Sequence, residues 1–203
     1  MASLVLIRHG NTFEAGQTPV WVGARTDLPL TAEGERQAEA AAVLMAEKVA
    51  PVSSIITGPL QRTRRMAALL AARLNAPVIL DNRLREIDYG QWEGLSHEEI
   101  TARYGPATLE GWERESLWPE NMGWKPSFAD VQKALRAFLE EQRQKLTPPS
   151  PSLLAVTSNG ILRLIHALAS GQDGAAAKVK TGHFCVLEPE KTGWRIVAWN
   201  EKP

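Results

Sequence analysis

Short apolar runs alternate with amphipathic segments of helix length along the chain, and this alternation limits the fold more than any other sequence feature. The apolar runs predict strands at Leu4–Ile7, Ser54–Thr57, Val78–Leu80, Leu153–Thr157, Phe184–Glu188 and Trp194–Trp199. The amphipathic segments predict helices at Ala32–Val49, Leu60–Leu74, from Ser127 to about Lys145, and Ile161–Ala169, with Thr31 and Ser127 as N-caps. Because strands that alternate with helices need crossover connections, we expect an α/β fold. Its three α/β/α layers would hold a mostly parallel sheet with helices on both faces.

The length of 203 residues predicts one domain spanning residues 1–203, because a typical domain has roughly 150 residues. Residues 85–128 interrupt the alternation, since Gly and Trp are frequent there and periodicity is weak. We expect this segment to be an insertion of loops and short helices over the carboxyl ends of the strands.

Charge and cysteine content exclude several classes of function. The 23 Lys and Arg residues balance the 23 Asp and Glu residues, which argues against a nucleic-acid or anionic-membrane partner. Cys185 is the only cysteine, and the four histidines lie far apart in the sequence, so we expect neither a disulfide nor a metal site. The apolar run after Met1 is too short for a signal peptide, and no stretch has the length of a membrane span. We therefore expect a cytoplasmic protein without a cofactor.

Chemically capable side chains follow four of the predicted strands. In open α/β sheets, ligands bind beyond the carboxyl ends of the strands, so these residues should meet at one edge. They are Arg8, His9, Asn11 and Thr12 after the first strand, Arg62 after the second, Glu86 after the third and Ser158 after the fourth. Two arginines converging on one place in a neutral protein predict a site for a small anion.

This set of residues can perform phosphoryl transfer. Arg8 and Arg62 could hold the phosphoryl oxygens, and their charge would keep the imidazole of His9 neutral and nucleophilic. Glu86 could protonate the leaving alcohol and then activate the water that hydrolyses a phosphohistidine. The alternative for each residue alone is structural: a hydrogen-bonded surface histidine and arginines in salt bridges. Their joint position after successive strands favours the catalytic interpretation.

Four blocks of the chain resemble the histidine phosphatase, or phosphoglycerate mutase-like, superfamily. They are Leu4–Thr12 (LVLIRHGNT), Gly23–Gly34 (GARTDLPLTAEG), Ser54–Ala67 (SIITGPLQRTRRMA) and Leu84–Gly94 (LREIDYGQWEG). The resemblance covers most of the chain, and it rests on the order of the blocks rather than on RHG alone. It implies that His9 is the phosphorylated nucleophile, that Arg8 and Arg62 bind phosphate, and that Glu86 is the proton donor. Asn11 and Thr12 would line the site.

One position departs from the family pattern. Val156–Arg163 (VTSNGILR) keeps the frame of the family's V-S-H-G-G-x-x-R motif, but Ser158 stands at the histidine position, where the resemblance implies that its hydroxyl hydrogen-bonds the bound phosphate. Losing one donor to the transition state typically costs roughly 10²–10³ in rate. The chain would then be a slow phosphatase, an enzyme in which His183 or Lys125 compensates, or a phosphate-binding protein without catalysis.

Aromatic and histidine side chains outside these blocks have simpler interpretations. Trp112, Trp118 and Trp124 in the insertion predict apolar packing of a lid, whereas Trp21 and Trp92 could wall the substrate pocket. His97 follows Ser96, which with Glu99 forms a capping box, and this pattern predicts a structural role.

We favour a phosphatase that acts on a small phosphorylated metabolite, and the sequence does not predict its oligomeric state. The main alternative is a degenerate, non-catalytic member that binds such metabolites. A phosphoglycerate mutase is a lesser alternative, because the histidine that mutases of this family use is missing. A serine hydrolase with Ser158, Asp173 and His183 is another lesser alternative, because Val156 stands where the G-x-S-x-G motif needs a glycine.

Overall fold

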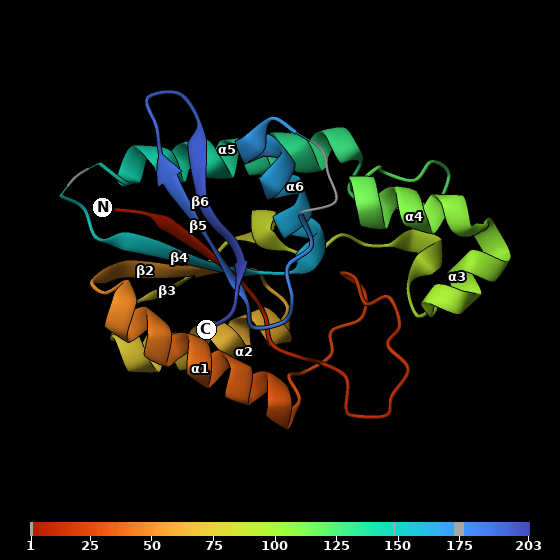
Figure 1. The fold of residues 1–203 in the computed structure, drawn as a ribbon, viewed down its shortest axis with the longest axis horizontal. Coiled ribbons are helices and arrows are strands. Elements are labelled where there is room, and N and C mark those ends of the chain that lie inside the picture. The colour runs from red at the N-terminus through yellow and green to blue at the C-terminus, as the bar shows by residue number, and fades with distance from the viewer. Residues whose placement is uncertain (1, 148, 173–176) are drawn as a thin grey trace.

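A computed structural model describes residues 2–147, 149–172 and 177–203, and within these residues the chain forms a six-stranded sheet with helices packed around it (Figure 1). The strands are β1 (Leu4–Arg8), β2 (Val52–Thr57), β3 (Val78–Leu80), β4 (Ser152–Thr157), β5 (Phe184–Pro189) and β6 (Trp194–Glu201). The helices are α1 (Ala32–Lys48), α2 (Gln61–Leu74), α3 (His97–Tyr104), α4 (Pro106–Glu115), α5 (Phe128–Lys145) and α6 (Asn159–Ser170), with short 3₁₀ turns η1 (Asn82–Leu84) and η2 (Gly90–Trp92). The predicted α/β class and each predicted strand and helix are confirmed.

The sheet has the order β3-β2-β4-β1-β5-β6, and its first four strands are parallel. β5 runs antiparallel to β1, and β6 runs antiparallel to β5, to which it is joined by a short turn without a helix. The carboxyl ends of the four parallel strands therefore meet at one edge. β5 begins at that edge, since its first residue Phe184 pairs with Ile7 near the end of β1.

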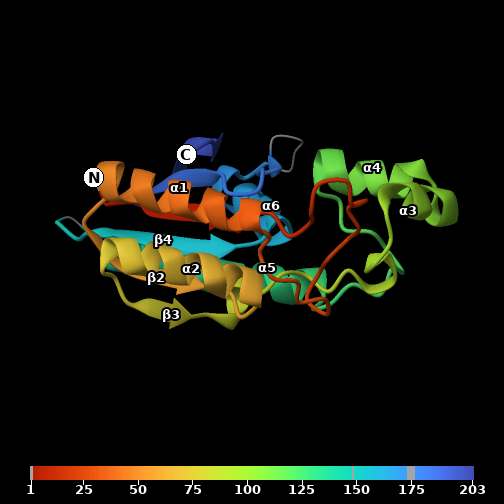
Figure 2. The same cartoon turned by 90° about the horizontal axis from the view of Figure 1, so that it is seen from below.

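Alternate residues of β1 face two separate hydrophobic cores, one on each side of the sheet. Val5 and Ile7 pack with Ala38 of α1 and Met66 of α2, whereas Leu4 and Leu6 belong to the core formed with α5 and α6. Figure 2 shows α1 and α2 together on one side of the sheet. Burial on both faces explains why the central strands read as continuous apolar runs.

Helix caps lie where the sequence indicated them. The Thr31 side chain accepts from the Gly34 amide, and the Ser127 side chain accepts from the Asp130 amide. α6 begins two residues earlier than predicted, at Asn159. This early start places the residues after β4 at the sheet edge.

The insertion contains η2, α3 and α4, which lie beyond the carboxyl edge of the sheet (Figure 1). Its core is a cluster of edge-to-face aromatic rings formed by Trp21, Tyr89, Trp92, Trp112, Trp118 and Trp124. The predicted lid packing is confirmed, as is the Ser96–Glu99 capping box. Trp92 does not wall a pocket, because it is fully buried in this cluster between Trp21 and Trp124. No helix within the described ranges combines the length and apolar character needed to cross a membrane.

Candidate active site

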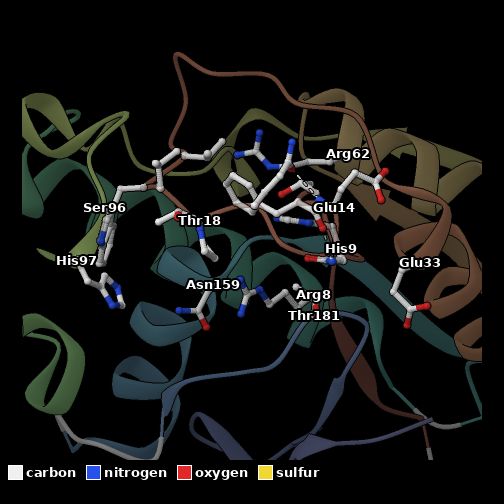
Figure 3. A pocket seen from close by; sticks show the side chains of 18 of the residues that line it. Arg8, His9, Glu14, Thr18, Glu33, Arg62, Ser96, His97, Asn159 and Thr181 are labelled. Carbon is white, nitrogen blue, oxygen red and sulfur yellow. Dashed lines mark hydrogen bonds between the residues drawn. The ribbon is translucent and has the colours of Figure 1, made fainter. Parts of the chain in front are cut away.

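A cavity of about 860 Å³ opens at the carboxyl edge of the sheet, and it contains six of the seven predicted site residues. Arg8, His9, Asn11, Thr12, Arg62 and Glu86 line it, and Trp21 also contributes to its wall. Figure 3 shows Arg8, His9 and Arg62 on one side of the cavity and Ser96 and His97 on the other. The residues that follow β1, β2 and β3 thus meet in one place, as the parallel topology requires.

His9 is buried at the end of β1, where its position is fixed by two hydrogen bonds. Its amide donates to the Thr157 carbonyl, and its Nδ1 lies 2.8 Å from the Gly10 carbonyl. A carbonyl only accepts, so Nδ1 carries the proton and Nε2 keeps a free lone pair. Burial lowers the pKa of His9 well below its ordinary value, and the charges of Arg62 and Arg8 lower it further. The imidazole is neutral at neutral pH, as a nucleophile must be.

Gly10 allows this arrangement because α1 packs directly against it. A Cβ at Gly10 would lie 2.2 Å from the Gly34 carbonyl oxygen, so only glycine fits between the loop and the first turn of α1.

Arg8 and Arg62 reach the cavity from different elements and keep their charge. Arg8 donates to the Val179 carbonyl, and burial lowers its pKa to about 10, which leaves the guanidinium protonated at neutral pH. Arg62, in the first turn of α2, donates to the carbonyls of Thr26 and Gly23 at 2.9 and 3.0 Å. A guanidinium has five N–H donors, so donors remain on Arg62 for an anion after these two bonds. These two hydrogen bonds to backbone carbonyls fix the orientation of the Arg62 guanidinium.

Glu86 is buried on the segment that follows β3 and η1. Its Oε1 accepts from the Ile87 amide at 2.9 Å and its Oε2 accepts from the Gly160 amide at 3.1 Å. Burial raises the pKa of Glu86 above its ordinary value, although the two amides, Arg62 and Arg8 oppose this shift. A carboxyl group that holds its proton to higher pH can act as a general acid.

Gly160 gives Glu86 the space that it occupies. A Cβ at this position would lie 2.5 Å from Glu86 Oε1 and 2.4 Å from the Tyr89 hydroxyl. Even an alanine here would displace the carboxyl group.

Asn11 and Thr12 line the cavity from the loop after His9. The Asn11 side chain donates to the Phe13 carbonyl at 2.7 Å, and the Asn11 backbone amide donates to Gln37 Oε1 at 2.9 Å. These bonds shape the loop around the cavity opening.

Ser158 is buried and does not line the cavity. Its side chain is 1% exposed, and its Oγ has no hydrogen-bond partner among the described residues. The next residue, Asn159, does line the cavity, and its Oδ1 accepts from the Val179 amide at 3.0 Å. Ser158 therefore carries an unsatisfied hydroxyl directly beside a wall residue.

The two candidate compensating residues lie outside this wall. His183 Nδ1 lies 3.0 Å from the Asn200 carbonyl, and Lys125 lines a different cavity. Asp173, the acid of the serine-hydrolase alternative, lies outside the described residues.

Sequence reasoning missed Tyr89, Asn159 and Thr181, which all line the cavity. Tyr89 lies inside a block already quoted, but only the structure shows that its hydroxyl and the Glu86 carboxyl group both lie against Gly160. Burial, with the Glu86 charge, raises the pKa of Tyr89 well above its ordinary value, so the hydroxyl stays protonated. Within the part of the chain that the structure describes, no three His, Cys, Asp or Glu side chains are grouped as metal ligands would be.

The fold and the cavity define an α/β protein with a neutral histidine, two arginines and a protonatable carboxyl group at the carboxyl edge of its sheet. The sequence model of one protein family, the histidine phosphatase superfamily (branch 1), matches residues 4–202 of this chain. The chain belongs to this superfamily.

Relatives and solved structures agree with this assignment. An uncharacterized phosphatase, PhoE, of Bacillus subtilis is 28% identical over 202 residues, which cover 98% of this chain and 95% of that protein. Phosphoserine phosphatase 1 of Hydrogenobacter thermophilus is 33% identical over 146 residues, which cover 71% of this chain and 66% of that protein. The structure of a mycobacterial glucosyl-3-phosphoglycerate phosphatase superposes with a TM-score of 0.83 at 25% identity and covers all of both chains. Phosphoglycerate mutases are also among the relatives, so the comparisons support phosphatase or mutase activity.

Proposed function

We propose that this protein is a phosphatase that hydrolyses a small phosphorylated metabolite through a phosphohistidine on His9. The observation that carries the proposal is the buried, neutral imidazole of His9 in one cavity with Arg8, Arg62 and Glu86. A protein that only binds phosphate needs the two cations but not the protonatable carboxyl group.

The reaction would take place in two balanced steps. In the first, His9 Nε2 attacks phosphorus, the ester P–O bond breaks, and Glu86 protonates the departing alkoxide. In the second, Glu86 takes a proton from water, the oxygen attacks phosphorus, and the P–N bond breaks with its electron pair returning to the imidazole. Arg8 and Arg62 stabilise the phosphoryl oxygens in both steps, and Asn11 and Thr12 line the phosphate site.

The relatives support a small phosphate ester as substrate. One is named for phosphoserine and another for glucosyl-3-phosphoglycerate, and both are small phosphorylated metabolites. A cavity of about 860 Å³ has room for an organic group as well as the phosphate.

The test is to incubate the purified protein with a panel of phosphorylated metabolites and to measure both inorganic phosphate and organic products. A phosphatase releases phosphate and the free alcohol in equal amounts. A mutase moves the phosphate to another position of the same metabolite, and a binding protein changes nothing. Either of the last two results, on a panel that the protein is shown to bind, would overturn the proposal.

We further propose that Ser158 stands where the family carries a second histidine and that it contributes little to turnover. The hydroxyl is buried and has no partner among the described residues, so Ser158→Ala removes an unsatisfied polar group. We expect a change in kcat below about threefold and a Tm that is unchanged or slightly higher. Ser158→His should raise kcat by about tenfold if the imidazole reaches the phosphoryl group.

Thermal unfolding with and without inorganic phosphate tests whether Ser158 contacts the anion. A ligand that binds only the folded state raises Tm, so an equal phosphate-dependent shift in wild type and Ser158→Ala means that Ser158 is not needed for binding. Loss of all turnover in Ser158→Ala, to the level of a His9 variant, would contradict this view and support the serine-hydrolase alternative.

A further inference from the structure

A second cavity, of about 350 Å³, lies on the other side of the segment that carries the candidate acid. Arg85 and Ile87 line only this cavity, Tyr89 lines only the first, and Glu86 lines both. The remaining wall comes from Ala24 and Arg25, from η1, from Lys125 and Pro126, from the first two turns of α5, and from Ile161.

The inner wall of this cavity is apolar. Ile87, Val131 and Ile161 line it but are at least nine-tenths buried, so they form a closely packed floor. The apolar surface that a ligand can reach comes mainly from Pro126 and Ala134, which are exposed and half-buried. An apolar wall of this kind accepts the hydrocarbon part of a ligand.

The charged residues at the cavity are only partly neutralised. Arg25 pairs with Asp88 at 2.9 Å, and Arg83 pairs with Asp81 and with Glu141. A fourth carboxylate, that of Asp130, lines the cavity and accepts from the Ser127 hydroxyl at 2.6 Å.

Two cations remain without a carboxylate partner among the described residues. Arg85 makes one side-chain hydrogen bond, to the Ala24 carbonyl at 3.3 Å, and the Lys125 ammonium makes none. Both side chains are exposed, so they can turn toward a ligand at the opening. Lys125 is held in place by its backbone, which pairs with that of Asp88.

We propose that this cavity is a second binding site, for a small amphipathic anion that places its apolar body against Pro126, Val131 and Ala134 and its anionic group between Arg85 and Lys125. A guanidinium and an ammonium both donate to carboxylate, sulfonate or phosphate oxygens, so the anionic group can be any of these. A neutral or cationic molecule of the same shape would leave the two cations unpaired. The site shares Glu86 with the first cavity but no arginine of the phosphate site, and it does not require that the protein be a phosphatase.

The test uses 1-anilinonaphthalene-8-sulfonate, a fluorescent aromatic anion, with inorganic phosphate present in excess to occupy the first cavity. We expect saturable binding of one probe per chain, measured as a fluorescence increase. The double variant Arg85→Gln and Lys125→Gln should weaken binding about tenfold, because it removes both charged donors. Ala134→Phe should also weaken it, because the larger side chain fills the cavity without changing its charge.

Two controls distinguish this site from other sources of binding. Lys133→Gln removes a cation from α5 that lines neither cavity, so this variant should bind the probe like wild type. The uncharged analogue N-phenyl-1-naphthylamine should bind wild type and the double variant equally. If the double variant and Ala134→Phe bind the anionic probe as tightly as Lys133→Gln does, the proposed site is wrong.

Discussion

His9→Ala is expected to lower phosphate release by about a thousandfold or more, because the alanine variant has no atom that can accept the phosphoryl group. The loop should keep its place, since the backbone amide at position 9 still donates to the Thr157 carbonyl. Substrate affinity should change far less than turnover, because Arg8 and Arg62 still hold the anion. Steady-state kinetics on the best ester from the panel measure both quantities.

Direct trapping of the intermediate gives a second readout. Wild type mixed with ³²P-labelled ester and quenched in alkaline denaturant should keep label on the protein, because a phosphohistidine is stable in alkali and labile in acid. His9→Ala should carry none. His97→Ala is the matched control, because His97 lines the same cavity from its opposite side, and it should keep the label. Equal turnover by wild type and His9→Ala would refute the assignment of the nucleophile.

The sequence predicted the fold and most of the candidate site for the same reason. The apolar runs of β1, β2 and β4 are buried on both faces, whereas the edge strand β3 is exposed, and the chemically capable residues follow those runs directly. Once the strands are parallel, Arg8, His9, Arg62 and Glu86 must lie at one edge. This inference needs no side-chain geometry.

Features that depend on packing between distant segments could not be predicted in this way. Tyr89 reaches the cavity because Gly160 leaves space for its hydroxyl, and the two residues are far apart in the sequence. Ser158 follows β4 as the other site residues follow their strands, yet it does not line the cavity. The start of the next helix places the residues after a strand, and α6 begins two residues before the predicted start.

The aromatic residues of the insertion illustrate the same limit. Their number predicted a packed lid, but Trp21 and Trp92 were equivalent by sequence, since both lie beside family blocks. In the structure only Trp21 lines the cavity, and Trp92 is buried behind it. The second cavity likewise depends on α5 packing against the segment after β3, a contact that no local pattern encodes.

Glu86→Gln should reduce activity on an alkyl phosphate by about a hundredfold or more, and on p-nitrophenyl phosphate by less than about tenfold. An alkoxide is a poor leaving group and needs a proton as it departs, whereas p-nitrophenolate leaves readily without one. Glutamine has nearly the same shape and can still accept one hydrogen bond from the Ile87 or Gly160 amide, so the cavity should be preserved. Comparable losses on both substrates would indicate a structural or binding role for Glu86.

The pH dependence of the alkyl phosphate reaction provides an independent test of the same role. Glu86 must be protonated to act as an acid, and burial raises its pKa above the ordinary value despite the opposing effects of the two amides, Arg62 and Arg8. Activity on the alkyl ester should therefore stay high above the ordinary pKa of a glutamic acid and fall as pH rises through the raised pKa. His9 does not cause this fall, because its pKa is lowered and its imidazole is already neutral at lower pH. Glu86→Gln cannot ionise at this position, so its low residual activity on the alkyl ester should not show the fall. A fall at the same pH in both proteins would assign the ionisation to another group and remove Glu86 from the role of general acid.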